Sequence, residues 1–199
     1  MSKGNIKSKI KFSTSVKSVN YNSDKFEVSY QDKANNKILH DKFDYVVVST
    51  GHFSVPFIPE YKGMSSFPGR IMHSHDFRDA EEFRDKNVIV LGSSYSAEDV
   101  ALQCNKYGAK SVTIGYRHNP MGFKWPSGMK EVYYLDKLEG SKAIFKDGTE
   151  QEADVIILCT GYLHHFPFLE ENLKLKTRNR LYPPKLYNCL LYTSDAADE

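Results

Sequence analysis

A strand, a glycine turn, a helix and a second strand follow one another within residues 87–116, and this order constrains the fold most. Asn87–Leu91 is a continuous apolar run of strand length, and Gly92 ends it. Apolar residues then recur at helical spacing over residues 96–107, before the strand-like run Ser111–Tyr116. This order predicts a βαβ unit with two parallel strands joined by a crossover helix.

Two similar runs, Asp44–Gly51 and Asp154–Gly161, bracket this unit. Each begins with an acid, continues as an apolar run rich in β-branched residues and ends in Thr-Gly. Each is typical of a strand buried on both faces. A domain inserted into another needs one strand that leaves the host domain and one that returns to it. The pair therefore predicts two interleaved dinucleotide-binding domains, while two similar strands of one sheet are the alternative.

The remaining pattern predicts antiparallel structure on either side of the unit. Lys9–Tyr30 alternates apolar and polar residues around a turn at Asn22–Asp24, which favours a β-meander. Residues 143–148 contain a short apolar run followed by Asp-Gly, which favours a hairpin. The class predicted is therefore α/β, with antiparallel additions.

The turn after the first strand of the unit is a degraded dinucleotide motif. In Gly92–Ala97 the first glycine and the final small residue of G-x-G-x-x-G/A are kept, and Ser94 replaces the middle glycine. The free N–H groups at the following helix start can hold phosphate oxygens. We interpret this as a pyrophosphate site, with an ordinary strand–helix turn as the alternative.

The end of the second strand distinguishes between the two nicotinamide cofactors. NAD-binding units usually place an acid there, which accepts a hydrogen bond from the ribose 2′-hydroxyl. Here Arg117 and His118 follow the strand and no acid is near. Because a guanidinium can clamp a 2′-phosphate, the sequence favours NADP over NAD. A solvated surface charge is the alternative role for Arg117.

Composition excludes several classes of function. A net charge of +2 across 199 residues provides no general attraction to nucleic acid or to an anionic membrane, and no apolar run is long enough to span a bilayer. The three cysteines include no CxxC pair, so a reduced cytoplasmic setting is expected. One candidate function is a flavin disulfide reductase, but such an enzyme needs a redox dithiol and this sequence contains no CxxC pair. A non-catalytic NADP-binding module is another candidate function.

Residues 67–78 contain a longer and more specific pattern. Phe67, Gly69, His73, Phe77 and Arg78 fit F-x-G-x-x-x-H-x-x-x-F-R. This pattern resembles the fingerprint of the flavin-containing monooxygenases, whose Baeyer–Villiger relatives carry tryptophan at the place of Phe77. We expect His73 to be a structural histidine that helps to join domains and shape the cofactor crevice.

Further segments are similar to the bacterial trimethylamine monooxygenases of this family, namely residues 51–54, 92–99, 116–117, 120–122, 124–126 and 159–169. The resemblance implies FAD in an N-terminal domain and NADPH in an inserted one. It implies that NADPH reduces FAD, that O2 adds to form a C4a-hydroperoxyflavin, and that an amine or sulfide takes the distal oxygen. Trimethylamine is the expected substrate; another N- or S-oxygenase and a Baeyer–Villiger enzyme are the alternatives.

The resemblance also assigns cofactor contacts by position. Gly92 and Ser94 of the glycine motif are the first of these contacts. The resemblance further implies that Arg117 faces the 2′-phosphate, helped by His118, where relatives have threonine. Val16 matches a position whose backbone meets the FAD adenine. Neither a catalytic side chain nor a metal ligand is expected anywhere in this sequence. Three further residues are implied to line the NADP site: Tyr95, Ser96 and Glu98.

The predicted fold is thus α/β, with a Rossmann-like NADP-binding domain inserted in a second, incomplete FAD-binding α/β domain. Residues 1–57 are expected to form part of the FAD-binding domain, 58–168 the NADP-binding domain and 169–188 the return. Residues 189–199 look like an adapter-derived, non-native tail. The sequence is expected to be part of a longer enzyme, inactive alone, with a homodimer as the default assembly.

Overall fold

The computed structural model describes residues 6–174, which form two compact units. One unit contains residues 6–52 and 164–174, and the other contains residues 53–163. Both boundaries fall earlier than the predicted ends at residues 57 and 168. The reason is that β4 (Val55–Pro56) pairs antiparallel with β13 (Tyr162–Leu163), and this pairing ties both connections to the second unit. The predicted tail at residues 189–199 lies outside the described residues.

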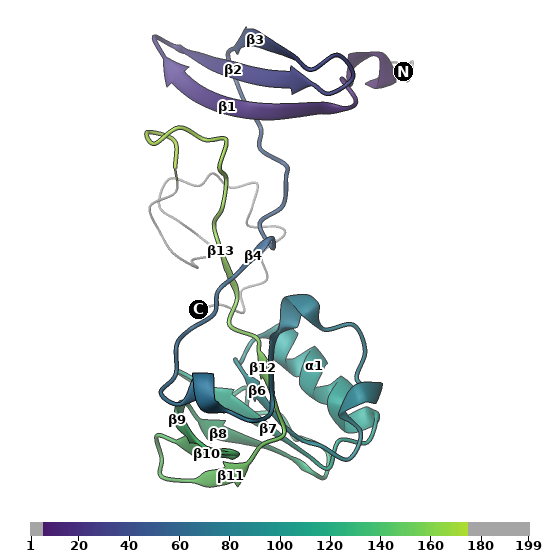
Figure 1. Cartoon of the computed structure of the whole chain (residues 1–199), viewed down its shortest axis with the longest axis vertical. Helices are drawn as coiled ribbons and strands as arrows, with labels where there is room; N and C mark the ends of the chain where they lie inside the picture. Colours follow the sequence, from purple (N-terminus) through teal and green to yellow (C-terminus); the bar gives the residue numbers. More distant parts are fainter. Residues whose placement is uncertain (1–5, 175–199) are drawn as a thin grey trace. The chain divides into compact units, whose positions relative to one another are not determined.

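The first unit is built on an antiparallel meander, as the alternation of Lys9–Tyr30 predicts. After the short helix η1 (Ile6–Lys9), three strands are hydrogen-bonded in the order β1-β2-β3 (Figure 1). Ser23 and Asp24 both adopt positive φ angles, 47° and 74°, which gives a tight hairpin. The bounds are β1 (Thr14–Asn22), β2 (Lys25–Asp32) and β3 (Lys37–Phe43).

The returning chain completes this unit along β1. The Val19 N–H donates to the carbonyl of Phe168 at 2.7 Å, and the Glu170 N–H donates to the carbonyl of Val19 at 3.0 Å. Val19 is 2% exposed and packs in a small core with Val28 and other apolar residues of both segments. The first unit is therefore made of two separate stretches of sequence, as a host domain interrupted by an insertion must be.

The prediction of a buried strand at Asp44–Gly51 is wrong. No strand of the described residues pairs with this segment, and Tyr45 and Val47 are 87% and 86% exposed. A β-branched run shows which conformation suits the residues, but burial needs a neighbouring strand on each side. The matching run at Asp154–Gly161 has those neighbours, and its strand β12 (Val155–Leu158) is buried throughout.

The second unit contains a five-stranded parallel sheet with the strand order β5-β12-β6-β7-β8, of which Figure 1 labels all but β5. The predicted βαβ unit is confirmed by β6, α1 and β7, since β6 and β7 are adjacent and parallel. The predicted apolar face of the helix is also confirmed, because all four of its buried residues lie there. The bounds are β5 (Arg70–His73), β6 (Asn87–Leu91), α1 (Tyr95–Lys106), β7 (Ser111–Tyr116) and β8 (Met129–Tyr133).

The two faces of this sheet carry two separate cores, because side chains alternate along each strand. Val88 and Val90 of β6 pack with the buried face of α1. Ile89 and Leu91 of the same strand pack with apolar residues of a three-stranded antiparallel sheet. That sheet includes the predicted hairpin, and its strands are β9 (Leu135–Glu139), β10 (Lys142–Phe145) and β11 (Glu150–Glu152).

Short 3-10 helices make the remaining connections of the second unit: η2 (Met64–Ser66), η3 (Ser74–Asp76) and η4 (Glu81–Phe83). Among residues 6–174, the structure contains no helix with the length and apolar character needed to cross a membrane.

Candidate functional site

A cleft of about 380 Å³ opens at the carboxyl ends of β6, β7 and β12. The chain leaves β6 toward β7 and β8 on one side, and later returns on the other side as β12. In an open parallel sheet, ligands bind at such a reversal of strand order, outside the carboxyl ends of the strands. The topology thus places this cleft where a dinucleotide would lie.

Gly92 brings the turn after β6 close to β12. Its φ angle is 142°, and a Cβ atom built there would lie 2.3 Å from the carbonyl oxygen of Cys159. Only a residue without a side chain allows this approach. The glycine of the sequence motif therefore serves the contact between two strand ends as well as the tight turn.

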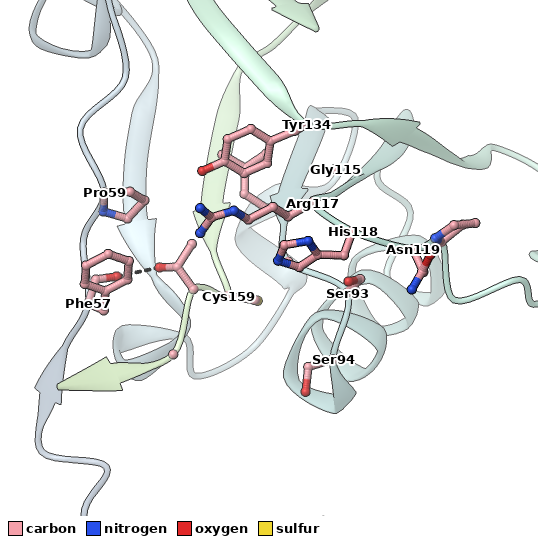
Figure 2. Close-up of a pocket in the computed structure, with 15 residues that line it drawn as sticks. Phe57, Pro59, Ser93, Ser94, Gly115, Arg117, His118, Asn119, Tyr134 and Cys159 are labelled. Carbon is pink, nitrogen blue, oxygen red and sulfur yellow. Dashed lines mark hydrogen bonds between the residues drawn. The ribbon is translucent and has the colours of Figure 1, made fainter. Parts of the chain in front are cut away.

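The start of α1 leaves a row of donors without partners. Within the described part of the chain, the N–H groups of residues 93–96 make no hydrogen bond, because no helical turn precedes them to supply carbonyl acceptors. The next two N–H groups, of Ala97 and Glu98, donate to the carbonyl of Ser94. Ser94 is the N-cap residue, and its hydroxyl does not cap the helix. Its side chain points away from Arg117 and His118 (Figure 2). A serine in place of the middle glycine therefore leaves the free N–H groups accessible to phosphate.

Arg117 supplies the positive charge of the cleft. It follows β7 directly and its guanidinium carbon lies 5.8 Å from the ring centroid of Tyr134, beside which it extends in Figure 2. No carboxylate of residues 6–174 forms an ion pair with it, and the lining includes neither Asp nor Glu. His118 also lines the cleft and is exposed. An anionic group could therefore approach without displacing an existing partner.

Tyr134 is held in place from outside the cleft. Its hydroxyl accepts a hydrogen bond from the Tyr61 hydroxyl at 3.0 Å, with the ring centroids 5.7 Å apart. Burial, followed by this hydrogen bond, raises the pKa of Tyr61 well above its ordinary value. Tyr61 therefore stays neutral and donates to the tyrosine whose ring lies beside Arg117.

The other predicted contacts lie outside the cleft lining. Tyr95, Ser96 and Glu98 lie on the first turn of α1, with Tyr95 and Ser96 exposed and Glu98 half-buried. Val16 lies on β1 in the other unit, is 43% exposed and adjoins a bulge. Contact of these four residues with a cofactor stays a prediction.

The fingerprint histidine organises the rim of the cleft. His73 is 3% exposed; its Nε2 donates to the Gly161 carbonyl at 3.0 Å, and its Nδ1 accepts from the His75 N–H at 3.0 Å. Burial lowers the pKa of His73, which agrees with this neutral ring. The same Gly161 carbonyl accepts from the Phe57 N–H, and Thr160 Oγ1 donates back to the Phe57 carbonyl at 2.5 Å (Figure 2). His73 is thus a buried histidine with both ring nitrogens hydrogen-bonded, as expected of a structural residue, and its part in joining domains stays a prediction.

Other fingerprint residues also serve packing. A Cβ atom at Gly69 would lie 2.3 Å from the Asp154 carbonyl, so β5 can approach the start of β12 only with glycine there. Phe67 is buried, and Phe77 stacks on Phe83 with ring centroids 6.0 Å apart. The pattern therefore joins β5 to β12, next to the cleft.

The cysteines that the structure describes do not form a redox pair. Cys104 and Cys159 are both free and buried. Burial raises the pKa of each thiol to about 12, so neither supplies a thiolate near neutral pH. Disulfide reduction through these two thiols is therefore excluded.

Several lining residues were not predicted from the sequence. Phe57 and Pro59 come from the crossing segment, Asn119 from the connection after β7, and Tyr134 from the connection after β8. Thr160 also lines the cleft without having been predicted to do so, although it belongs to the second copy of the repeated Thr-Gly pair.

Comparison with known proteins agrees with this geometry. A family model described as pyridine nucleotide-disulphide oxidoreductase matches residues 4–132, and one described as flavin-binding monooxygenase-like matches residues 129–192. The first match shows the class, a pyridine-nucleotide flavoprotein oxidoreductase. The chain belongs, within this class, to the flavin-containing monooxygenase family. FAD and NADPH are the cofactors of that family.

Individual relatives make the resemblance more specific. The chain is 82% identical over 192 residues to a trimethylamine monooxygenase of Pelagibacter sp. strain HTCC7211, which covers 96% of the chain and 43% of the relative. A crystal structure of Tmm from the same strain superposes with a TM-score of 0.80 at 85% identity, covering 93% of the chain and 42% of that structure. An S-allyl-L-cysteine S-oxygenase from Allium sativum gives 0.67 at 33% identity, covering 80% and 37%. The chain thus spans less than half the length of each of these proteins.

Proposed function

We propose that the chain binds NADPH in the cleft at the carboxyl ends of β6, β7 and β12. The pyrophosphate lies against the free N–H groups of residues 93–96, where the partial positive charge of the α1 start favours an anion. The 2′-phosphate lies beside Arg117. The observation that carries this proposal is an unpaired guanidinium at the end of β7, in a lining without any carboxylate.

We further propose that the complete protein is an NADPH- and FAD-dependent monooxygenase that converts trimethylamine to its N-oxide. The names of the relatives support the substrate, and the monooxygenase fingerprint at residues 67–78 supports the reaction. When bound, FAD would supply the chemistry that reacts with O2. The main chain at Val16 would contact the adenine of the FAD. The residues of this chain bind and orient the reductant, and His73 keeps the cleft rim in place through Gly161.

The other NADP contacts belong to the same proposal. The side chains of Tyr95, Ser96 and Glu98 lie on the first turn of α1, which carries part of the row of free N–H groups, within reach of a nucleotide that extends along the start of α1. His118 follows Arg117 and would donate a hydrogen bond to the same phosphate. The free, buried cysteines favour the cytoplasm as the compartment, and a homodimer is the commonest assembly for such an enzyme.

Two measurements test these proposals separately. Calorimetric titration of the chain with NADP⁺ and NAD⁺ tests the cleft, and equal affinities would contradict the role of Arg117. A chimera tests the activity: residues 1–188 replace the matching part of the 82% identical relative. We expect trimethylamine-dependent NADPH oxidation with N-oxide as the product.

The same chimera tests the second candidate reaction. The likeness to a plant S-oxygenase favours sulfur as an alternative acceptor of oxygen. Sulfoxide formation from alkyl cysteines without any amine turnover would replace trimethylamine by a sulfide as the substrate. A folded chimera that binds flavin but oxygenates neither class would contradict the monooxygenase proposal.

A further inference from the structure

The connection between β7 and β8 carries one side of the cleft without any helix or strand of its own. It runs over residues 117–128, and its first four residues all line the cleft, beginning with Arg117. Such a segment keeps one conformation only if contacts outside its own backbone hold it. One contact is made at its far end, where the Asn105 side-chain amide donates to the Ser127 carbonyl at 3.0 Å.

The carboxylate of Glu131, which is half-buried on β8, holds the middle of this connection. Its Oε1 accepts from the Met121 N–H at 2.6 Å, and its Oε2 accepts from the Gly122 N–H at 3.1 Å and from Trp125 Nε1 at 3.0 Å. Three donors spread along the connection therefore converge on one charged acceptor, and the first of them directly follows the cleft lining.

The surrounding packing agrees with a fixed connection. Met121 and Trp125 both pack against the core on the α1 side of the sheet. Gly122 has a φ angle of 72°, which suits glycine, and no atom lies within 4 Å of the place of a Cβ. The backbone turns at this residue, and its N–H donates to the carboxylate. The acceptor and the turn together determine the course of the chain from Arg117 to β8.

We propose that Glu131 is a positioning residue for the NADP site, which holds residues 117–128 so that Arg117 faces the 2′-phosphate. This inference rests on the proposed function of the cleft. Without the carboxylate, the connection would have to become ordered when the nucleotide binds. The free-energy cost of that ordering would weaken the observed affinity. A glutamine at this position places an NH2 group, which is a donor, against some of the three donors that the carboxylate accepts.

The test compares Glu131→Gln with a matched control in the full chain. Glu139→Gln removes the same charge from an exposed position on β9, where the carboxylate pairs with Lys137. We expect NADP⁺ to bind about tenfold more weakly to Glu131→Gln, NAD⁺ affinity to change less, and Glu139→Gln to bind as the original chain does. Trp125 is the only tryptophan, so its emission reports directly whether the connection has moved.

A double-mutant cycle distinguishes positioning from a general loss of structure. If Glu131 acts through Arg117, then Glu131→Gln should weaken NADP⁺ binding less than about twofold once Arg117→Ala is present. The inference is overturned if the losses of NADP⁺ affinity in the two single variants add fully in the double variant. It is also overturned if a folded Glu131→Gln chain shows shifted Trp125 emission but unchanged NADP⁺ affinity. If Glu131→Gln does not fold, Trp125→Phe removes a single donor, and an NADP⁺ affinity that is not reduced then overturns it too. No preference for NADP⁺ in the original chain would contradict the proposed function itself.

Discussion

Gly92→Ala should destabilise the second unit through a collision between two strand ends. The new Cβ atom would lie 2.3 Å from the Cys159 carbonyl oxygen and 3.1 Å from its carbon. Both atoms belong to the backbone at the end of β12, so they cannot move aside as a flexible side chain would. The left-handed φ angle of 142° adds strain of about 1 kcal/mol, and overpacking adds about 1–3 kcal/mol. We expect the free energy of unfolding to fall by about 2–4 kcal/mol, a large part of a typical domain's stability.

The assay is urea denaturation followed by Trp125 emission and far-ultraviolet circular dichroism. Gly148→Ala is the matched control, because Gly148 has a positive φ angle of 83° and no atom within 4 Å of the place of a Cβ. It should therefore show only the conformational strain, about 1 kcal/mol. Equal losses in the two variants would refute the argument, since the close approach of Gly92 to Cys159 would then contribute nothing.

Three further predictions concern charge, protonation and packing. Arg117→Ala should weaken NADP⁺ binding by about tenfold or more and leave NAD⁺ affinity almost unchanged. Calorimetry measures both affinities, with Lys142→Ala as an exposed control. Equal losses of affinity for both nucleotides would contradict the proposal that Arg117 binds the 2′-phosphate. Burial lowers the pKa of His73 below its ordinary 6.5, so stability should be complete above that pH and decline as the pH falls below it. His73→Asn should flatten this decline in urea midpoints between about pH 7.5 and about pH 5.5, and an unchanged slope would mean that His73 does not cause it. Phe83→Ala should cost about 3–5 kcal/mol, because the ring is 1% exposed and stacks on Phe77; a loss below about 1 kcal/mol in denaturant would show that the site is not tightly packed.

The parts of the fold that sequence predicted share a local cause. The periodicities of β6, α1 and β7 follow from which faces of each element are buried, and those periods can be counted along the chain. The meander of β1 and β2 was predictable for the same reason, with its turn at Asn22–Asp24. Gly92 and Arg117 could be placed because strand ends in a parallel sheet meet at one edge.

The failure at Asp44–Gly51 has the opposite cause. Its composition is almost that of Asp154–Gly161, yet only the second run forms a strand among the described residues. Burial of such a run depends on neighbouring strands, and no pattern inside the run specifies them. The limits of the compact units also depend on distant contacts, since the short β4–β13 pair joins residues far apart in the sequence.

The sequence by itself determined the class of this protein, because a strand–glycine–helix–strand order, a fingerprint over residues 67–78 and an arginine after the second strand are all local patterns. Tertiary structure alone decided how the cleft is made. It brought Phe57, Tyr134 and Thr160 to the same opening and placed the Glu131 carboxylate where it accepts three donors from the connection that carries Arg117. These contacts join residues from different strands and connections, and their geometry is set by how those elements pack together.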